Sequence, residues 1–133
     1  MSGKMASSPV IPIAEADICI FQGATFSQTL IWEMGNPPVP VNLTNYSAKL
    51  QVRSSHKSKA IIIELSTGNS RISLGTGGDM TTGAINLFIS AANSAELSVC
   101  EEVKAVYDLE MTSGYTVSRI LQGNVIIVPE VTK

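Results

Sequence analysis

The 133-residue chain is poor in charged residues, in aromatic residues and in histidine. Charged residues make up 15% of it, whereas about a quarter is usual in soluble domains. The net charge is −2, no basic stripe is visible, and only seven aromatic side chains (three Phe, three Tyr and one Trp) are available to stack on bases. These shortages argue against nucleic-acid binding as the main task. The low charge also suggests that partners cover part of the surface.

Long apolar runs are absent as well. The longest are about four or five residues, far below the roughly 20 that a membrane-spanning helix needs. The N-terminal stretch "MSGKMASSPVIPIAEA" has one lysine but no continuous apolar segment. We therefore expect neither a signal peptide nor a membrane partner.

Cysteine is scarce, with Cys19 and Cys100 far apart in the sequence and no CxxC motif. We expect two free, buried thiols, because Cys packs as a small hydrophobic residue. A disulfide or a redox pair is the alternative. Two Cys and one His are a weak basis for zinc, so we expect no metal and no cofactor.

Residues 1–16 are rich in Ser, Pro and small residues. Pro12 disfavours helix at the residue before it and removes one backbone donor, which predicts an extended N-terminal arm. A disordered tail is the alternative. If the arm docks on a neighbouring subunit, Val10, Ile11 and Ile13 are the expected anchors.

From Asp17 onward the hydrophobic pattern has a period of two and is repeatedly interrupted by turns. In "SAKLQVRS" the residues Ala48, Leu50 and Val52 share the expected inner face. The segment 25–33 is partly apolar on both faces, so we expect a central strand. The predicted strands are 17–22, 25–33, 47–54, 60–66, 71–74, 84–90, 103–112 and 116–128.

One short helix interrupts this series, in "SAANSAELSV", with Ser90 as its N-cap. No βαβ alternation is present, so a parallel doubly wound sheet is not expected. Strands at this spacing are typical of a sandwich or a barrel. We predict an all-β protein. Its single antiparallel β-sandwich domain spans residues 17–133, with one short helix and an extended arm over residues 1–16.

The stretch "AVYDLEMTSGYTVSRILQG" alternates most regularly. Ala105, Tyr107, Leu109 and Met111 share one face, and a hairpin turn at "SGY" follows. On the other face, Arg119 is expected near Asp108 or Glu110 as an exposed cross-strand pair. Use of the two carboxylates in acid–base work or cation binding is the alternative.

Other chemistry-bearing residues have ordinary structural interpretations. His56 lies in a polar turn and belongs to no recognisable Ser-His-Asp set. The loop "SLGTGGDMTTG", which contains Asp79, lacks the lysine of a phosphate-binding loop. Trp32 is expected in the core, and the glycosylation-like "NLT" and "NYS" are attributed to chance. No catalytic residues stand out.

The segments "FQGATFSQTLIWEMGNPPVPVNLTNYSAKLQVRSS", "LSTGNSRISL", "GAINLFISAANSAEL" and "VYDLEMTSGYTVSRILQGNVIIVPEVT" resemble small structural proteins of tailed bacteriophages. More loosely, they are similar to the immunoglobulin-like N-terminal domains of baseplate and receptor-binding-protein carriers. The resemblance covers about residues 18–132 and implies an immunoglobulin-like sandwich. Its motifs are strand and turn signals, so it carries over no catalytic residue. The "PPVP" loop departs from the pattern near Pro37–Pro40.

The resemblance implies a non-enzymatic virion protein that is assembled in the bacterial cytoplasm. We expect an oligomeric adaptor in the tail or baseplate region that attaches a fibre or tailspike to other virion proteins. A head decoration (cement) protein that bridges capsid subunits is the second hypothesis. A carbohydrate-binding module is the third, and a hydrolase dependent on His56 is the fourth. The expected partner-contacting residues are Val10, Ile11, Ile13, Pro37, Pro38 and Tyr115.

Overall fold

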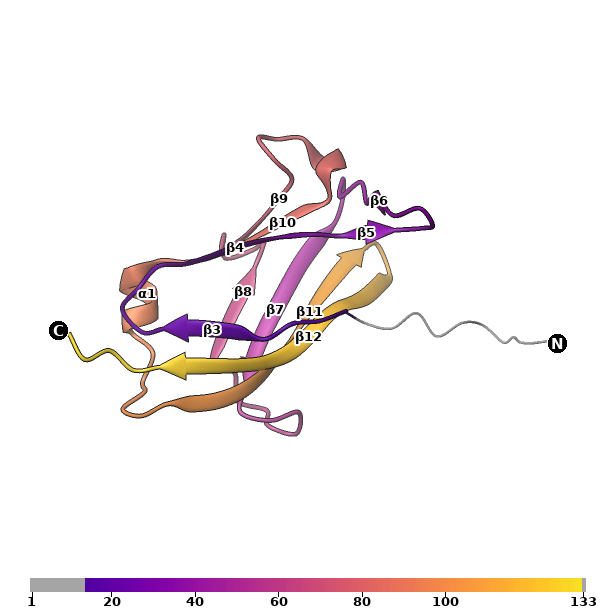
Figure 1. Ribbon diagram of the computed structural model, residues 1–133. Helices are drawn as coiled ribbons and strands as arrows, with labels where there is room; N and C mark the ends of the chain where they lie inside the picture. The colour runs from indigo at the N-terminus through magenta and orange to yellow at the C-terminus, as the bar shows by residue number, and fades with distance from the viewer. Residues whose placement is uncertain (1–13, 133) are drawn as a thin grey trace.

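The computed structural model describes residues 14–132. Two sheets face each other, and a short hairpin and one short helix lie at their ends (Figure 1). The smaller sheet is antiparallel, whereas the larger one also contains two parallel pairs, which the predicted antiparallel sandwich did not include. The all-β sandwich predicted from the sequence is confirmed. In the part of the chain that the structure covers, no helix is long and apolar enough to span a membrane.

The larger sheet contains six strands, in the order β2-β12-β11-β7-β8, with β3 also beside β12. Both N-terminal strands pair in parallel with β12, and the remaining pairs are antiparallel. Its strands are β2 (Ala14–Glu15), β3 (Ile18–Phe21), β7 (Ser47–Arg53), β8 (Ile63–Ser66), β11 (Val103–Ser113) and β12 (Thr116–Val128).

The smaller sheet has three strands in the order β4-β10-β9. A separate two-stranded hairpin is formed by β5 and β6. The bounds of these strands are β4 (Phe26–Ile31), β10 (Ala84–Ile89), β9 (Ile72–Leu74), β5 (Glu33–Met34) and β6 (Val39–Pro40). Only β10 pairs with β4 among the described strands, so β4 is an edge strand. The expectation of a central strand there is wrong. Both of its faces carry apolar side chains, yet one face is open to solvent.

The strand order is that of an immunoglobulin-like domain. Strands B, E and D of such a domain correspond to β4, β10 and β9. Strands G, F, C and C′ correspond to β12, β11, β7 and β8. The inter-sheet disulfide of antibody domains has no counterpart in the described residues, because Cys19 and Cys100 are both free.

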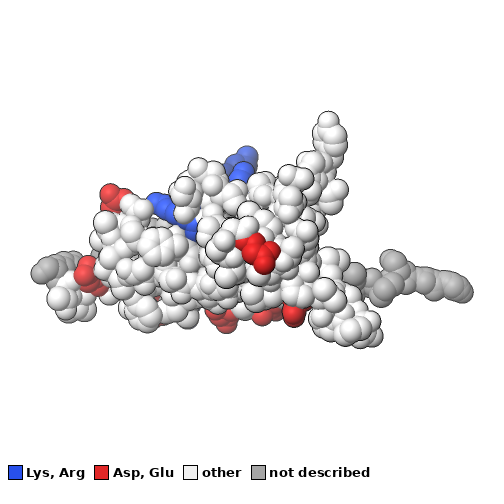
Figure 2. Space-filling view, turned by 90° about the horizontal axis from the view of Figure 1, so that it is seen from above, with Lys and Arg blue, Asp and Glu red and all other residues white. Residues whose placement is uncertain are grey.

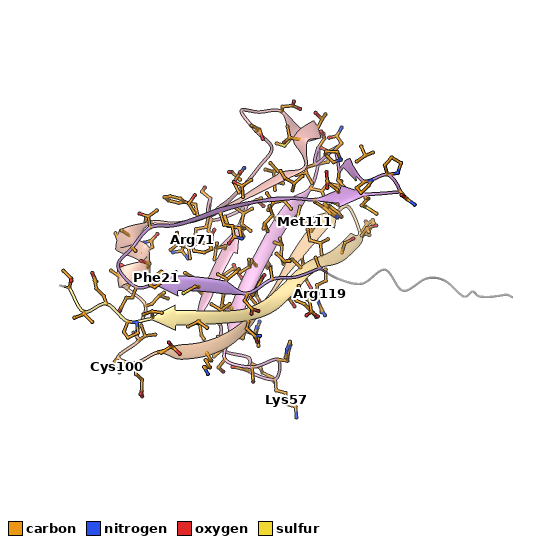
Figure 3. All side chains as sticks on the ribbon, viewed as in Figure 1. Phe21, Lys57, Arg71, Cys100, Met111 and Arg119 are labelled. Carbon is orange, nitrogen blue, oxygen red and sulfur yellow. The ribbon has the colours of Figure 1, made fainter. Side chains whose placement is uncertain are left out.

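The core lies between the sheets and confirms the inward faces that the period-two pattern predicts. The residues Ala48, Leu50 and Val52 of β7 are buried opposite buried residues of β11. Met111 is fully buried between the layers (Figure 3). From the smaller sheet the core receives Ile72, Ile85, Leu87 and Ile89.

The predicted helix is confirmed as α1 (Ala91–Ala95), where the Ser90 hydroxyl accepts a hydrogen bond from the Asn93 N–H. Buried Ser94 ties this helix to the turn between β3 and β4. Its Oγ accepts from the Gly23 N–H at 2.9 Å and donates to the Ala24 carbonyl at 2.8 Å. A 3-10 turn, η1 (Met80–Thr82), precedes β10.

The expected burial of the two thiols is wrong, because both cysteines are exposed. Cys19 points outward from β3, in which alternate residues face solvent. Cys100 lies on the connection between α1 and β11, at the same end of the molecule as Phe21 (Figure 3). Within "AIIIELS", only Ile63–Ser66 forms a strand.

Candidate interaction surface

Three segments that are far apart in the sequence lie at one end of the sandwich (Figure 1). They are the start of β2, the β5–β6 hairpin and the β11–β12 hairpin, and we call this region the open end. It corresponds to the end of an immunoglobulin variable domain that carries the B–C and F–G loops.

An apolar hollow of about 620 Å³ opens here between β2 and β4. Its walls combine residues from both sheets with Pro38 of the β5–β6 hairpin. The larger apolar lining residues include Leu30, Trp32, Ile85, Ile120 and Leu121. Its charged lining residues are both acidic, Glu15 and Glu33. The surface is therefore suited to an apolar partner with a neutral or basic flank.

Backbone hydrogen bonds on both sides hold Trp32 in place. Its N–H donates to the Gly83 carbonyl, and its carbonyl accepts from the Val41 N–H, both at 2.9 Å. The indole meets Tyr46 edge to face, with 5.4 Å between ring centroids. A β-carbon on Gly83 would lie 2.7 Å from the Trp32 carbonyl oxygen. The ring is thus partly packed on the core and partly available to the hollow.

The opposite wall depends on close contact between the N-terminal strand and β12. The Tyr107 hydroxyl donates to the Ala16 carbonyl at 2.7 Å. Gly123 allows this approach, because a β-carbon there would overlap the same carbonyl oxygen. Burial, and to a smaller extent the charge of Asp17, raise the pKa of Tyr107 to about 12.

A bulge in β12 supplies two adjacent apolar residues to the hollow. The pairing of β11 with β12 shifts between Leu109 and Glu110, which leaves Ile120 as the extra residue. An extra residue reverses the alternation of side chains along a strand. Ile120 and Leu121 therefore both line the hollow.

Three of the predicted contact residues, Pro37, Pro38 and Tyr115, lie at the open end (Figure 1). Pro38 lines the hollow and Pro37 is its exposed neighbour. Tyr115 lies in the β11–β12 turn at the same end and is fully exposed. Val10, Ile11 and Ile13 lie outside the described residues.

Sequence reasoning missed the contributions of Trp32, Leu30 and Ile120 to this surface. Trp32 was expected in the core, and the structure packs it against the core while leaving it partly exposed. The adjacent apolar pair Ile120-Leu121 was the available signal, because neighbouring strand residues normally face opposite ways.

The charged residues of the larger sheet form a separate outer face. The Arg119 Nε lies 3.3 Å from Asp108 Oδ2, and both side chains are well exposed. This is one of the two expected cross-strand pairs. A shallow hollow of about 320 Å³ nearby is lined by Lys49, Gln51, Arg53, His56, Val106, Tyr107, Asp108 and Glu110.

Several polar groups of this charged face pair with one another. The Gln51 amide donates to Glu64 at 2.7 Å and accepts from Arg53 at 2.7 Å. His56 is exposed on the turn after β7. The arrangement is that of a solvated sheet face.

No group of three His, Cys, Asp or Glu residues within residues 14–132 is arranged to hold a metal ion. Asp79 instead caps η1, and hydrogen bonds from the Thr81 hydroxyl and N–H lower the pKa of its carboxyl. The outer face of the smaller sheet exposes Ser27, Thr29, Ser73 and Phe88. The side from which η1 projects is largely uncharged (Figure 2).

A scan against protein-family models finds no match, and no curated protein matches the sequence. Three solved structures illustrate the distant similarity of the fold. The extracellular domain of the voltage-gated sodium channel beta4 subunit has 12% identity and a TM-score of 0.42, over 94% of this chain and 100% of that one. The N-terminal domain of phage TP901-1 ORF48 has 12% identity and a TM-score of 0.37, over 86% and 85%. Murine CRIg has 10% identity and a TM-score of 0.38, over 86% and 92%.

Proposed function

We propose that this chain is a non-enzymatic structural protein of a tailed-bacteriophage particle. It acts as an adaptor in the tail or baseplate region and attaches a fibre or tailspike through subunit–subunit contacts. The observation that carries the proposal is the open end, which has an apolar hollow and, on the β11–β12 turn, the exposed Tyr115. The phage assignment comes from the sequence resemblance.

The composition of the open end is that of a protein interface. Aromatic and apolar groups are enriched at protein interfaces, and charged groups are depleted at interface centres. The open end has this composition, whereas the outer face of the larger sheet carries paired charges. A partner that covers the open end removes the exposed apolar area from water.

Copy number in purified particles tests this function. Quantitative mass spectrometry of the phage that encodes the chain should find a low count in multiples of the tail symmetry. A count near that of the major capsid protein would instead support a cement protein. Absence from the particle would refute a virion role.

A matched pair of variants tests the open end itself. Tyr115 and Val131 both have apolar surface and are almost fully exposed. Tyr115 is in the β11–β12 turn and Val131 follows β12, and that turn and the C-terminal segment lie at opposite ends of the sandwich (Figure 1). Tyr115→Asp should reduce incorporation into particles, whereas Val131→Asp should not. Equal incorporation of the two variants would contradict the assignment of the open end as the contact surface.

A further inference from the structure

The edge of β4 beside the apolar hollow is open to strand addition. Among the described strands, β4 pairs only with β10, and an edge strand presents backbone N–H and C=O groups to an incoming chain. In immunoglobulin-like domains the sheet that contains B, E and D also contains strand A. Here both N-terminal strands pair with β12 instead.

We propose that residues 10–13 of a second copy of this chain add to the β4 edge and insert Ile11 and Ile13 into the hollow. The two isoleucines share one face of an extended segment, because side chains alternate along a strand. Strand addition of this kind combines backbone hydrogen bonds with pockets for alternate side chains.

The segment has the chemistry that this site requires. Pro12 favours an extended conformation at Ile11, and proline is tolerated in an edge strand when its nitrogen faces solvent. The N–H groups of Ile11 and Ile13 then face β4. Four extended residues span about 13 Å, which is shorter than the six-residue β4.

Charge supports the same pairing. Residues 1–13 contain one basic residue, Lys4, and no acidic residue. The hollow has Glu15 and Glu33 as its charged lining residues. Opposite charges at the rim of an interface fix orientation and speed association.

Chain direction favours exchange between copies over insertion into the same molecule. The turn after β3 reverses the chain, so β2 and β4 run in opposite directions (Figure 1). Ala14 lines the hollow together with the last residues of β4 and with Trp32 and Glu33, which follow β4. The described chain begins level with β5, which follows β4 (Figure 1).

To reach its own β4, the segment would have to reverse just before Ala14, which is already paired with Leu121. A β-turn occupies four residues. Such a reversal would use the residues that must pair with β4. A second copy has no such constraint.

The test uses the full-length chain and its single tryptophan, Trp32, as a reporter. Sedimentation velocity should show association that increases with concentration in the native chain. The double variant Ile11→Asp/Ile13→Asp should associate about a hundredfold more weakly or worse, because burial of each isoleucine is lost. Its Trp32 emission should shift to the red as water enters the hollow.

Two controls make the outcome specific. Ser7→Asp/Ser8→Asp adds the same charge outside the proposed segment and should leave association intact. A peptide of residues 7–14 should restore the blue emission of the Ile11→Asp/Ile13→Asp chain. The same peptide with Asp at positions 11 and 13 should not.

Three results would overturn the proposal. Unchanged association of the Ile11→Asp/Ile13→Asp variant would exclude the segment. A native chain that stays monomeric, with emission sensitive to these substitutions, would show that each segment fills the hollow of its own molecule. A native chain that is monomeric and insensitive to them would show that the segment does not enter the hollow. Because the test uses purified protein, it is independent of the proposed virion role.

Discussion

The two ends of the sandwich are built in contrasting ways. At the end that carries α1, polar side chains close the structure. The Gln22 amide donates to the Leu97 carbonyl at 2.6 Å and accepts from the Glu130 N–H at 2.9 Å. Buried Ser94 joins α1 to the turn after β3.

At the open end the same two sheets separate around an apolar hollow. Few side-chain hydrogen bonds cross it, and Tyr115 projects into solvent. The two ends therefore differ in how their polar groups are satisfied. The α1 end is closed by these hydrogen bonds, and the open end is the surface that we propose for a partner.

The largest stability effect is expected where the N-terminal strand forms a wall of the hollow. Gly123→Ala places a β-carbon against the Ala16 carbonyl oxygen, so the N-terminal strand must move from β12. We expect a loss of about 3 kcal/mol, measured by chemical denaturation. Ser118→Ala is the control, because Ser118 lies on β12 like Gly123. Gly77 is unsuitable as a control because its φ is positive. Equal stability of Gly123→Ala and the native chain would show that this wall is adaptable.

The next effect tests closure of the α1 end. Ser94→Ala removes two partly buried hydrogen bonds, one from the Gly23 N–H and one to the Ala24 carbonyl, and each such bond contributes about 0.5–1.5 kcal/mol. We expect a loss of about 2 kcal/mol in the free energy of unfolding. Exposed Ser98→Ala should change it little. If the two variants unfold alike, the hydroxyl is not what closes this end.

Tyr107 links the core to the N-terminal strand and gives a pH-dependent effect. Tyr107→Phe removes the hydrogen bond to Ala16, at an expected cost of about 1 kcal/mol at neutral pH. The folded-state pKa is about 12, whereas an unfolded tyrosine titrates near 10. Above pH 10 the unfolded chain therefore loses this proton while the folded chain keeps it, so stability falls.

The stabilising contribution of this proton is complete below pH 10 and is lost as the pH rises through about 12. Denaturation curves of the native chain should therefore lose stability across this window more steeply than those of Tyr107→Phe. Parallel pH profiles for the two proteins would contradict the raised pKa.

The smallest effect is expected at the open end. Tyr115→Ala should change the free energy of unfolding by less than about 0.5 kcal/mol, because the side chain makes no buried contact. Thermal denaturation of the purified chain measures this. A larger loss would mean that the turn residue stabilises the domain, and the contrast between the ends would weaken.

Local chemistry in the sequence determined much of the fold. Alternation in "SAKLQVRS" and "AVYDLEMT" identified the inner faces of β7 and β11, because side chains on a strand alternate whatever the strand's partners are. Ser90 marked the start of α1 because its hydroxyl satisfies a free N–H of the first turn. The hairpin at "SGY" followed from its glycine and its flanking strands.

Only the tertiary structure decided which strands became neighbours. It made β4 an edge strand, exposed Cys19 and Cys100, and placed Pro38, Tyr115 and Ala14 at one end. It also turned Ile120 and Leu121 toward one hollow through a bulge. These features depend on contacts between distant segments, and no local pattern encodes the partner of a strand edge. The strand pattern could therefore be predicted from the sequence, whereas the proposed interaction surface depends on how the strands are assembled.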